Sequence, residues 1–127
     1  MATNIQFTVI TPEREVVAGQ TDAVTIPAFD GELGVLPRRA PLMCELGIGQ
    51  FRYRKDGRTQ RVLIEGGFAQ VYANTVTVLT PTAVVAEDVT DAMIEETRQA
   101  IDAAESGERR TKLGRRLGVL RGLKNVS

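Results

Sequence analysis

The chain has 127 residues, equal numbers of acidic and basic side chains, 43% hydrophobic residues and only 5% aromatic ones. This length suits one domain, or one small domain with an appendage, and the hydrophobic share is enough for a packed core. The absence of histidine excludes His-ligated metal sites and His-activated nucleophiles, and a single cysteine excludes an internal disulfide. No hydrophobic run is long enough to span a membrane, so we expect a soluble chain of the cytosolic type.

Short runs of alternating or β-branched residues, separated by turn residues, fill the first 85 positions. Lys55-Asp56-Gly57 and Asn74 are the clearest hairpin turns, and Gly66-Gly67 predicts a bend with close backbone approach. We expect a break at Gly19. The predicted strands are 4–10, 16–17, 23–26, 42–46, 51–54, 58–64, 68–72, 75–79 and 83–85. Their even spacing predicts an antiparallel β-sandwich or barrel.

The segment from Pro27 to Leu42 combines turn residues with large apolar side chains. Its glycines and prolines predict an ordered loop with built-in turns rather than a flexible linker. Arg38 and Arg39 lie between two prolines, and Glu32 adds a negative charge earlier in the segment. A stiff, charged, partly apolar loop suits a docking surface because little entropy is lost on binding, although a purely structural loop between strands is the simpler interpretation.

After residue 86 the apolar period changes from two to about 3.6 residues, which predicts two helices. Asp88 is the expected N-cap of the first helix, which Ser106-Gly107 ends. Its apolar stripe consists of Met93, Ile94, Thr97, Ala100, Ile101 and Ala104. The second helix is expected at about 108–124, and its apolar face consists of Leu113, Leu117 and Leu120. The short link between them predicts an antiparallel helical hairpin over 87–127, so the domains are 1–86 and 87–127.

Three glycines, Gly114, Gly118 and Gly122, recur every four residues in the second helix. Each costs up to about 1 kcal/mol relative to alanine, so together they cost roughly 3 kcal/mol of helix stability. They indicate either close packing against another helix or a helix marginal enough to unfold and refold; we favour the second. The hairpin is also divided by charge, with an acidic first part and a basic second part. The second part holds Arg109, Arg110, Arg115, Arg116 and Arg121.

No set of residues predicts catalysis or a cofactor. Glu65, Glu87 and Asp88 are not spaced as an acid–base pair, and residues 31–34 lack the rest of a phosphate-binding motif. Cys44 lies among apolar residues and is expected to be a small core residue. The basic hairpin around Arg52 could contact RNA, but a solvated face is the better interpretation. We therefore expect a partner-binding module that is not an enzyme and binds no nucleic acid.

The chain resembles the epsilon subunit of bacterial F-type ATP synthases, equivalent to the mitochondrial delta subunit. The resemblance rests on G-E-L-G-V-L-P-R-R-A-P-L at 31–42, on G-G-F-A-Q-V-Y-A-N-T-V-T-V-L at 66–79, and on the order of sandwich and hairpin. It implies a non-catalytic rotor subunit, peripheral at the cytoplasmic face of the membrane and attached only through the complex. In this family the sandwich binds the gamma subunit and the ring of c subunits, so it helps transmit rotation.

The resemblance also implies roles for individual residues. It places the c-ring and gamma contacts at Gly31, Glu32, Leu33, Arg38, Arg39 and Leu42. The family's hairpin can lie folded or extend to the catalytic alpha/beta head and inhibit ATP hydrolysis, and the hairpin arginines suit an acidic surface there. The alternative is a stand-alone nucleotide-sensing domain.

Two departures from the family pattern change what we expect. Members usually carry Gly where Arg38 stands and His where Arg39 stands, so this loop is more positive. Some members bind ATP through an I-D-x-x-R-A pattern at the start of the first helix. Residues 89–94 read V-T-D-A-M-I and lack that arginine, so we expect weak ATP binding or none.

Overall fold

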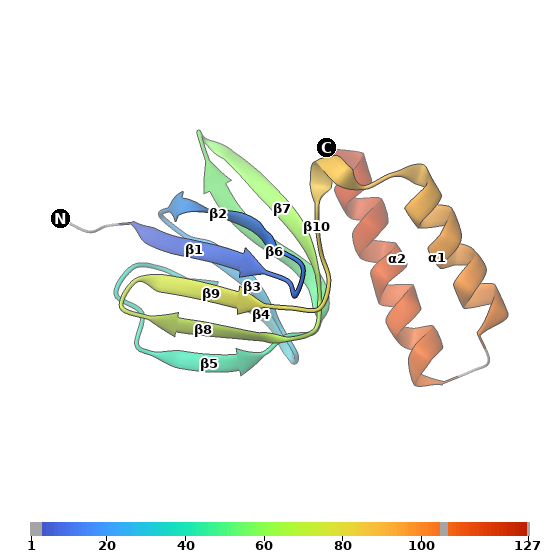
Figure 1. Cartoon of the computed structure of the whole chain (residues 1–127), viewed down its shortest axis with the longest axis horizontal. Coiled ribbons are helices and arrows are strands. Elements are labelled where there is room, and N and C mark those ends of the chain that lie inside the picture. Colours follow the sequence, from blue (N-terminus) through green and yellow to red (C-terminus); the bar gives the residue numbers. More distant parts are fainter. Residues whose placement is uncertain (1–3, 105–106, 127) are drawn as a thin grey trace.

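The computed structural model describes residues 4–104 and 107–126, and in it two β-sheets pack face to face with two helices at one end (Figure 1). This confirms a β-sandwich followed by a helical hairpin. The strands are β1 Ile5–Ile10, β2 Glu15–Thr21, β3 Val24–Ala28, β4 Gly31–Val35, β5 Leu42–Glu45, β6 Ile48–Lys55, β7 Arg58–Glu65, β8 Phe68–Tyr72, β9 Thr75–Leu79 and β10 Ala83–Val85. The helices are the single 3-10 turn η1 Ala86–Asp88, α1 Asp91–Ala103 and α2 Glu108–Val126.

One sheet has the strand order β2-β1-β9-β8-β5 and the other has β10-β7-β6-β3-β4. Neighbouring strands are antiparallel except β1 and β9, which run parallel with Phe7 opposite Val76. The prediction of a wholly antiparallel sandwich is therefore wrong at this pair. Parallel strands need a long connection, and the strands between β1 and β9 in the chain provide it.

Apolar side chains at alternate strand positions meet between the two sheets and form the main core. Ile5, Phe7 and Val9 of β1 point inward and are buried. The ring of Phe7 lies 5.7 Å from that of Phe51 and 4.4 Å from that of Tyr53, centroid to centroid. These tilted aromatic contacts add to the stabilisation that burial provides.

The two hairpin turns that the sequence predicts are confirmed. Asp56 and Gly57 have φ of 54° and 76°, and Ala73 and Asn74 have φ of 49° and 63°. Two successive residues with positive φ match the right-handed twist of the flanking strands, which explains the tight connections β6–β7 and β8–β9.

Of the two predictions made for glycines in the sandwich, the structure confirms the one for Gly67 and contradicts the one for Gly19. Gly67 has φ of 98°, and a Cβ there would lie 2.0 Å from the carbonyl oxygen of Leu79, so the predicted close backbone approach is confirmed. Gly19 does not break the chain into two strands. It lies inside β2 opposite Phe7, because backbone hydrogen bonds to β1 continue on both sides of it.

The segment from Pro27 to Leu42 is less of a loop than the sequence predicts. Residues 31–35 form β4, which pairs antiparallel with β3 after a turn at Phe29 and Asp30. Val35 is buried and Leu33 packs against the core, so these two apolar side chains belong to a strand, whereas Phe29 and Leu36 lie outside it and are exposed. Apart from that turn, only residues 36–41 of the segment lie outside a strand.

The hairpin begins two residues later than predicted. Asp88 belongs to η1, and the N-cap of α1 is Thr90, whose side chain accepts a hydrogen bond of 3.2 Å from the backbone N–H of Met93. Thr97 and Ala104, at the centre and end of the predicted stripe, are buried, which confirms the face. Of the predicted helix stop, Ser106 lies outside the described residues.

The second helix docks on the sandwich through a separate small core. Leu120 and Leu123 are fully buried against Leu63 of β7 and Val89, and Met93 and Ile94 of α1 pack on the same cluster. Gly114 and Gly118 are not required for close packing of α2 against a neighbouring element, since a Cβ at either position would meet nothing within 4 Å. That observation is against the close-packing interpretation of these two glycines.

Candidate functional site

We call the segment from Pro27 to Leu42, which the sequence predicts to be a docking surface, the docking segment. Its first part lies at the β3–β4 turn, next to the helices. Glu32 forms a bidentate ion pair with Arg52 of β6, with N–O distances of 2.6 Å and 3.0 Å. It also lines a shallow groove that Arg115 and Val119 of α2 border. Leu33, by contrast, is half-buried and packs on the core.

Glu32 and Arg52 shift each other's titration. The hydrogen bonds from the guanidinium group hold the pKa of the Glu32 carboxyl below its ordinary value, and the same bonds raise the pKa of Arg52. The carboxylate is thus engaged within the sandwich. A partner that uses Glu32 would have to share it with Arg52 or displace Arg52, which lowers the gain from any new ion pair.

The second part of the docking segment lies at the opposite end of the sandwich. Arg38 has φ of 69°, and its backbone N–H donates a 2.7 Å hydrogen bond to Asn74 Oδ1 in the β8–β9 turn, which lies away from the helices (Figure 1). Arg38 and Arg39 are exposed and form no ion pair within the described parts of the chain. Nearby, Leu42 is half-buried and packs on the core.

The six predicted contact residues therefore do not make one continuous patch. Gly31 and Glu32 lie near α2, Arg38 and Arg39 lie near the β8–β9 turn, and the two leucines of the set are partly buried in the core. The structure places two charged groups at different ends of strand β4 and the loop after it.

A group of exposed apolar side chains, which the sequence analysis missed, lies on the outer face of the sheet β2-β1-β9-β8-β5. Met43, Phe68, Tyr72 and Leu79 are 69%, 54%, 61% and 53% exposed. Phe68 stands directly opposite Leu79 in the β8–β9 register. The sequence already contained a signal for this group. Phe68 and Tyr72 lie on one face of β8, and the residues that alternate with them on the other face are also apolar, so both faces of the strand carry hydrophobic side chains. We call Met43, Phe68, Tyr72 and Leu79 the apolar face.

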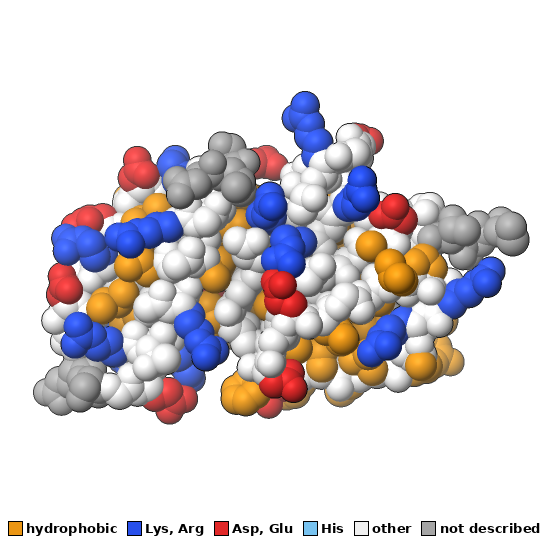
Figure 2. Space-filling view, turned by 180° about the vertical axis from the view of Figure 1, so that it is seen from behind, with side chains coloured by type: hydrophobic (Ala, Val, Ile, Leu, Met, Phe, Trp, Pro, Cys, Tyr) orange, Lys and Arg blue, Asp and Glu red, His pale blue; other side chains and the backbone are white. Residues whose placement is uncertain are grey.

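The hairpin arginines differ from one another in their surroundings. Arg109, Arg110, Arg115 and Arg121 are exposed, and basic side chains are prominent over the helical half in the view from behind (Figure 2). Arg116 is half-buried instead, because it pairs with Glu65 at the end of β7.

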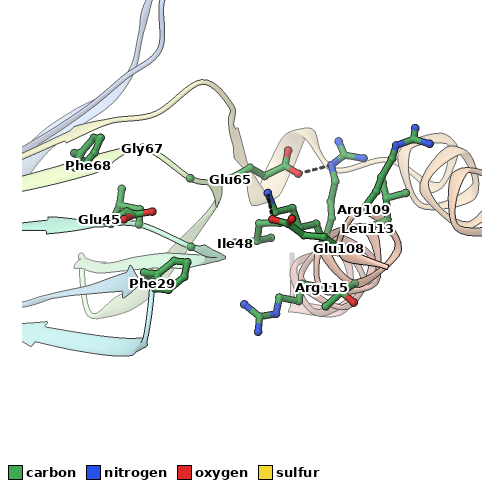
Figure 3. A pocket seen from close by; sticks show the side chains of 16 residues that line it. Phe29, Glu45, Ile48, Glu65, Gly67, Phe68, Glu108, Arg109, Leu113 and Arg115 are labelled. Atoms are coloured by element: carbon green, nitrogen blue, oxygen red, sulfur yellow. Dashed lines mark ion pairs between the residues drawn. The ribbon is translucent and has the colours of Figure 1, made fainter. Parts of the chain in front are cut away.

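A groove of about 810 Å³ separates the first half of α2 from the sandwich (Figure 3). Phe29, Ile48 and Phe68 line the sandwich side, and Arg109 and Leu113 line the helix side. The first half of α2 therefore stands off from the sheets, whereas its second half packs on them.

The described residues contain no group of three or more His, Cys, Asp or Glu side chains that could hold a metal ion. Cys44 packs against the core, and partial burial raises the pKa of its thiol, which disfavours the reactive thiolate. Among the described helices, none is long and apolar enough to cross a membrane.

The family model described as "ATP synthase, Delta/Epsilon chain, beta-sandwich domain" matches residues 4–86. The chain belongs to this family. The ATP synthase epsilon chain of Nitratidesulfovibrio vulgaris is 41% identical over 105 residues, which cover 83% of this chain and 76% of the relative. That of Carboxydothermus hydrogenoformans is 38% identical over 116 residues, covering 91% and 81%. The predicted non-catalytic stalk subunit of an F-type ATP synthase is thereby confirmed.

The fold is shared with more distant solved structures. A chain in the Euglena gracilis mitochondrial ATP synthase, in a structure of "OSCP/F1/c-ring", superposes with a TM-score of 0.76 at 22% identity, covering 99% of this chain and 82% of that one. A chain of the Tetrahymena thermophila mitochondrial ATP synthase "central stalk/cring" gives 0.60 at 15% identity, covering 96% and 95%. At such identities the likeness concerns the fold, including the order of sandwich and hairpin.

Proposed function

We propose that this chain transmits rotation in an ATP synthase by binding two partners. The apolar face binds the gamma subunit, and the charged residues of the docking segment, Glu32 at one end and Arg38 and Arg39 at the other, bind the c-subunit ring. The apolar face is the observation that carries the proposal. Four large hydrophobic side chains, each more than half exposed on one side of one sheet, indicate a protein interface rather than a solvated surface.

The gamma subunit is the partner we assign to the apolar face. Aromatic and Met side chains are enriched at the centres of protein interfaces, where they supply most of the binding energy. The sheet beneath them is rigid, since Ala69, Val71, Val76 and Val78 on its other side are buried in the core. Binding therefore costs little conformational entropy on this side of the interface.

The c-ring is the partner we assign to Arg38 and Arg39, with Gly31 and Glu32 as a secondary contact. The two arginines are exposed beside Pro37 and Pro41, and a hydrogen bond to Asn74 fixes the backbone of the loop. Contact with the ring would hold the chain at the cytoplasmic face of the membrane as a peripheral subunit.

Binding to purified gamma subunit tests the first assignment. The double substitution Phe68→Ser, Leu79→Ser removes two neighbouring side chains of the apolar face and should weaken gamma binding by roughly 2–4 kcal/mol, about 30-fold or more. Gln70→Ser is the matched control, since Gln70 is exposed on the same face of β8 but polar. Unchanged gamma affinity in the double variant, with its fold intact by circular dichroism, would overturn the assignment.

We further propose that 87–127 is a regulatory unit that acts on the catalytic alpha/beta head. The exposed arginines of α2 can form ion pairs with an acidic surface on that head. Deleting 88–127 should raise ATP hydrolysis by the assembled enzyme while gamma binding persists. Replacing Arg109, Arg110, Arg115 and Arg121 with Gln should raise hydrolysis in the same direction. If neither change alters hydrolysis, the hairpin has no inhibitory role.

A further inference from the structure

Arg116 joins three elements of the fold at one point. Its Nε lies 3.0 Å from Glu65 Oε1 at the end of β7, an ion pair that Figure 3 marks by the dashed line from Glu65. Its Nη1 donates a 2.5 Å hydrogen bond to Thr97 Oγ1 of α1. Thr97 in turn donates to the backbone oxygen of Met93 at 2.8 Å. A single side chain of α2 therefore holds both the other helix and the sandwich.

This cluster is shielded from water more than the other ion pairs of the hairpin. The side chains of Arg116 and Glu65 are 25% and 20% exposed, and Thr97 is 2% exposed. By comparison, Arg98 pairs within α1 while 47% exposed, and Lys112 pairs within α2 while 62% exposed. Losing one member of a partly desolvated cluster costs more than losing a surface pair, because the remaining polar groups are left without their partners.

Arg116 also marks the boundary between two halves of α2. Beyond it, Leu120 and Leu123 are fully buried in the small core against β7 and η1. Before it, the helix lines the open groove, so apolar contact with the sandwich is slight there. Arg116 ties this part of α2 to β7 through its ion pair with Glu65.

Helix propensity is low around Arg116. Gly114 and Gly118 flank it at two residues on either side, and both face open space. Each glycine lowers the local tendency to remain helical by about fivefold relative to alanine. No neighbour requires glycine at either position, so the weakness is not a by-product of close packing.

We propose that Arg116 is a latch: its bonds to Glu65 and Thr97 keep the first half of α2 helical, packed on α1 and docked, and their loss releases that half first. Opening begins between 108 and 118 while Leu120 and Leu123 stay in place as the pivot. The proposal rests on the proposed regulatory function only for its consequence in the assembled enzyme. The latch itself is a property of the isolated chain.

Hydrogen exchange of the backbone amides in the full-length chain tests the latch. Arg116→Ala should speed exchange about tenfold in 109–118 and in α1, with little change in 120–124. Thr97→Val and Glu65→Gln should each give a smaller increase in the same region. Arg110→Ala is the matched control, because Arg110 is an exposed arginine of the same half of α2 that forms no ion pair in the described residues. The pair Glu65→Arg, Arg116→Glu should recover part of the protection.

Two results would overturn the latch. One is exchange in Arg116→Ala no faster than in Arg110→Ala; the other is an equal increase through 120–124, which would mean that α2 undocks as one unit. Gamma binding by the same variants separates the two proposals. Normal binding with unchanged exchange removes the latch alone, whereas a wild-type chain that fails to bind gamma removes the proposed rotor contact and leaves the latch intact.

Discussion

The glycines of α2 lead to a prediction with a defined sign. In the double variant Gly114→Ala, Gly118→Ala the new methyl groups point into open space, since nothing lies within 4 Å of either Cβ position. No steric cost therefore offsets the gain in helix propensity. At about 0.8–1 kcal/mol for each position, the double variant should stabilise α2 by about 2 kcal/mol.

Native-state hydrogen exchange measures this gain where it arises. A stabilisation of about 2 kcal/mol corresponds to roughly 30-fold slower opening of the amides in the first half of α2. Gly122→Ala is the internal control. Its Cβ would lie 3.3 Å from Gln50 Nε2, so that side chain must shift and the gain should be smaller. If the double variant exchanges no more slowly than wild type, glycine does not limit the stability of this helix.

Three further predictions concern the sandwich and its ligands. Gly67→Ala should prevent folding or cost more than about 4 kcal/mol in urea unfolding, because its Cβ would lie 2.0 Å from the Leu79 carbonyl oxygen at a φ that disfavours side chains. Glu32→Gln should cost less than about 1 kcal/mol at neutral pH, since the pair is exposed. The pKa of Glu32 is lowered from 4.5, so this contribution is complete above that value and is lost as pH falls through the lower folded-state pKa; a cost that persisted in strong acid would contradict the assignment. Calorimetry should detect weak ATP binding or none, and sub-millimolar affinity would disprove that expectation.

Local signals in the sequence predicted most of the fold because they act over a few residues. The Asp56–Gly57 and Asn74 turns fix hairpins directly, and the 3.6-residue period of 93–104 fixes the buried face of α1. The predictions were wrong where contacts with residues distant in the sequence determine the secondary structure. Gly19 stays in a strand because β1 pairs with it, and 31–35 becomes a strand because β3 and the core require it.

The candidate site was predicted less well than the fold, for the same reason. The sequence singled out charged residues in one segment but gave no sign that Glu32 would be paired with Arg52, twenty positions away. It also grouped the arginines of α2, although only contact with β7 and α1 distinguishes Arg116 from the rest. Phe68 and Tyr72 indicated an apolar outer side of β8, but which side of each sheet is covered depends on the packing of the whole chain, and only the structure shows that Met43 and Leu79 lie on the same face.

The two proposed activities use separate surfaces, and this separation has a mechanical consequence. The hairpin packs on β7, η1 and the start of β6, whereas the apolar face lies on the outer side of the other sheet. Releasing Arg116 therefore changes the helices without uncovering or distorting the strands that carry Met43, Phe68, Tyr72 and Leu79. A subunit built in this way can remain attached to a rotor partner in either posture of its hairpin, because the free energy of holding the partner and that of holding the hairpin come from different side chains. Only Phe68 borders both the apolar face and the groove beside α2, so any coupling between the two surfaces through side-chain contact has to pass close to that residue.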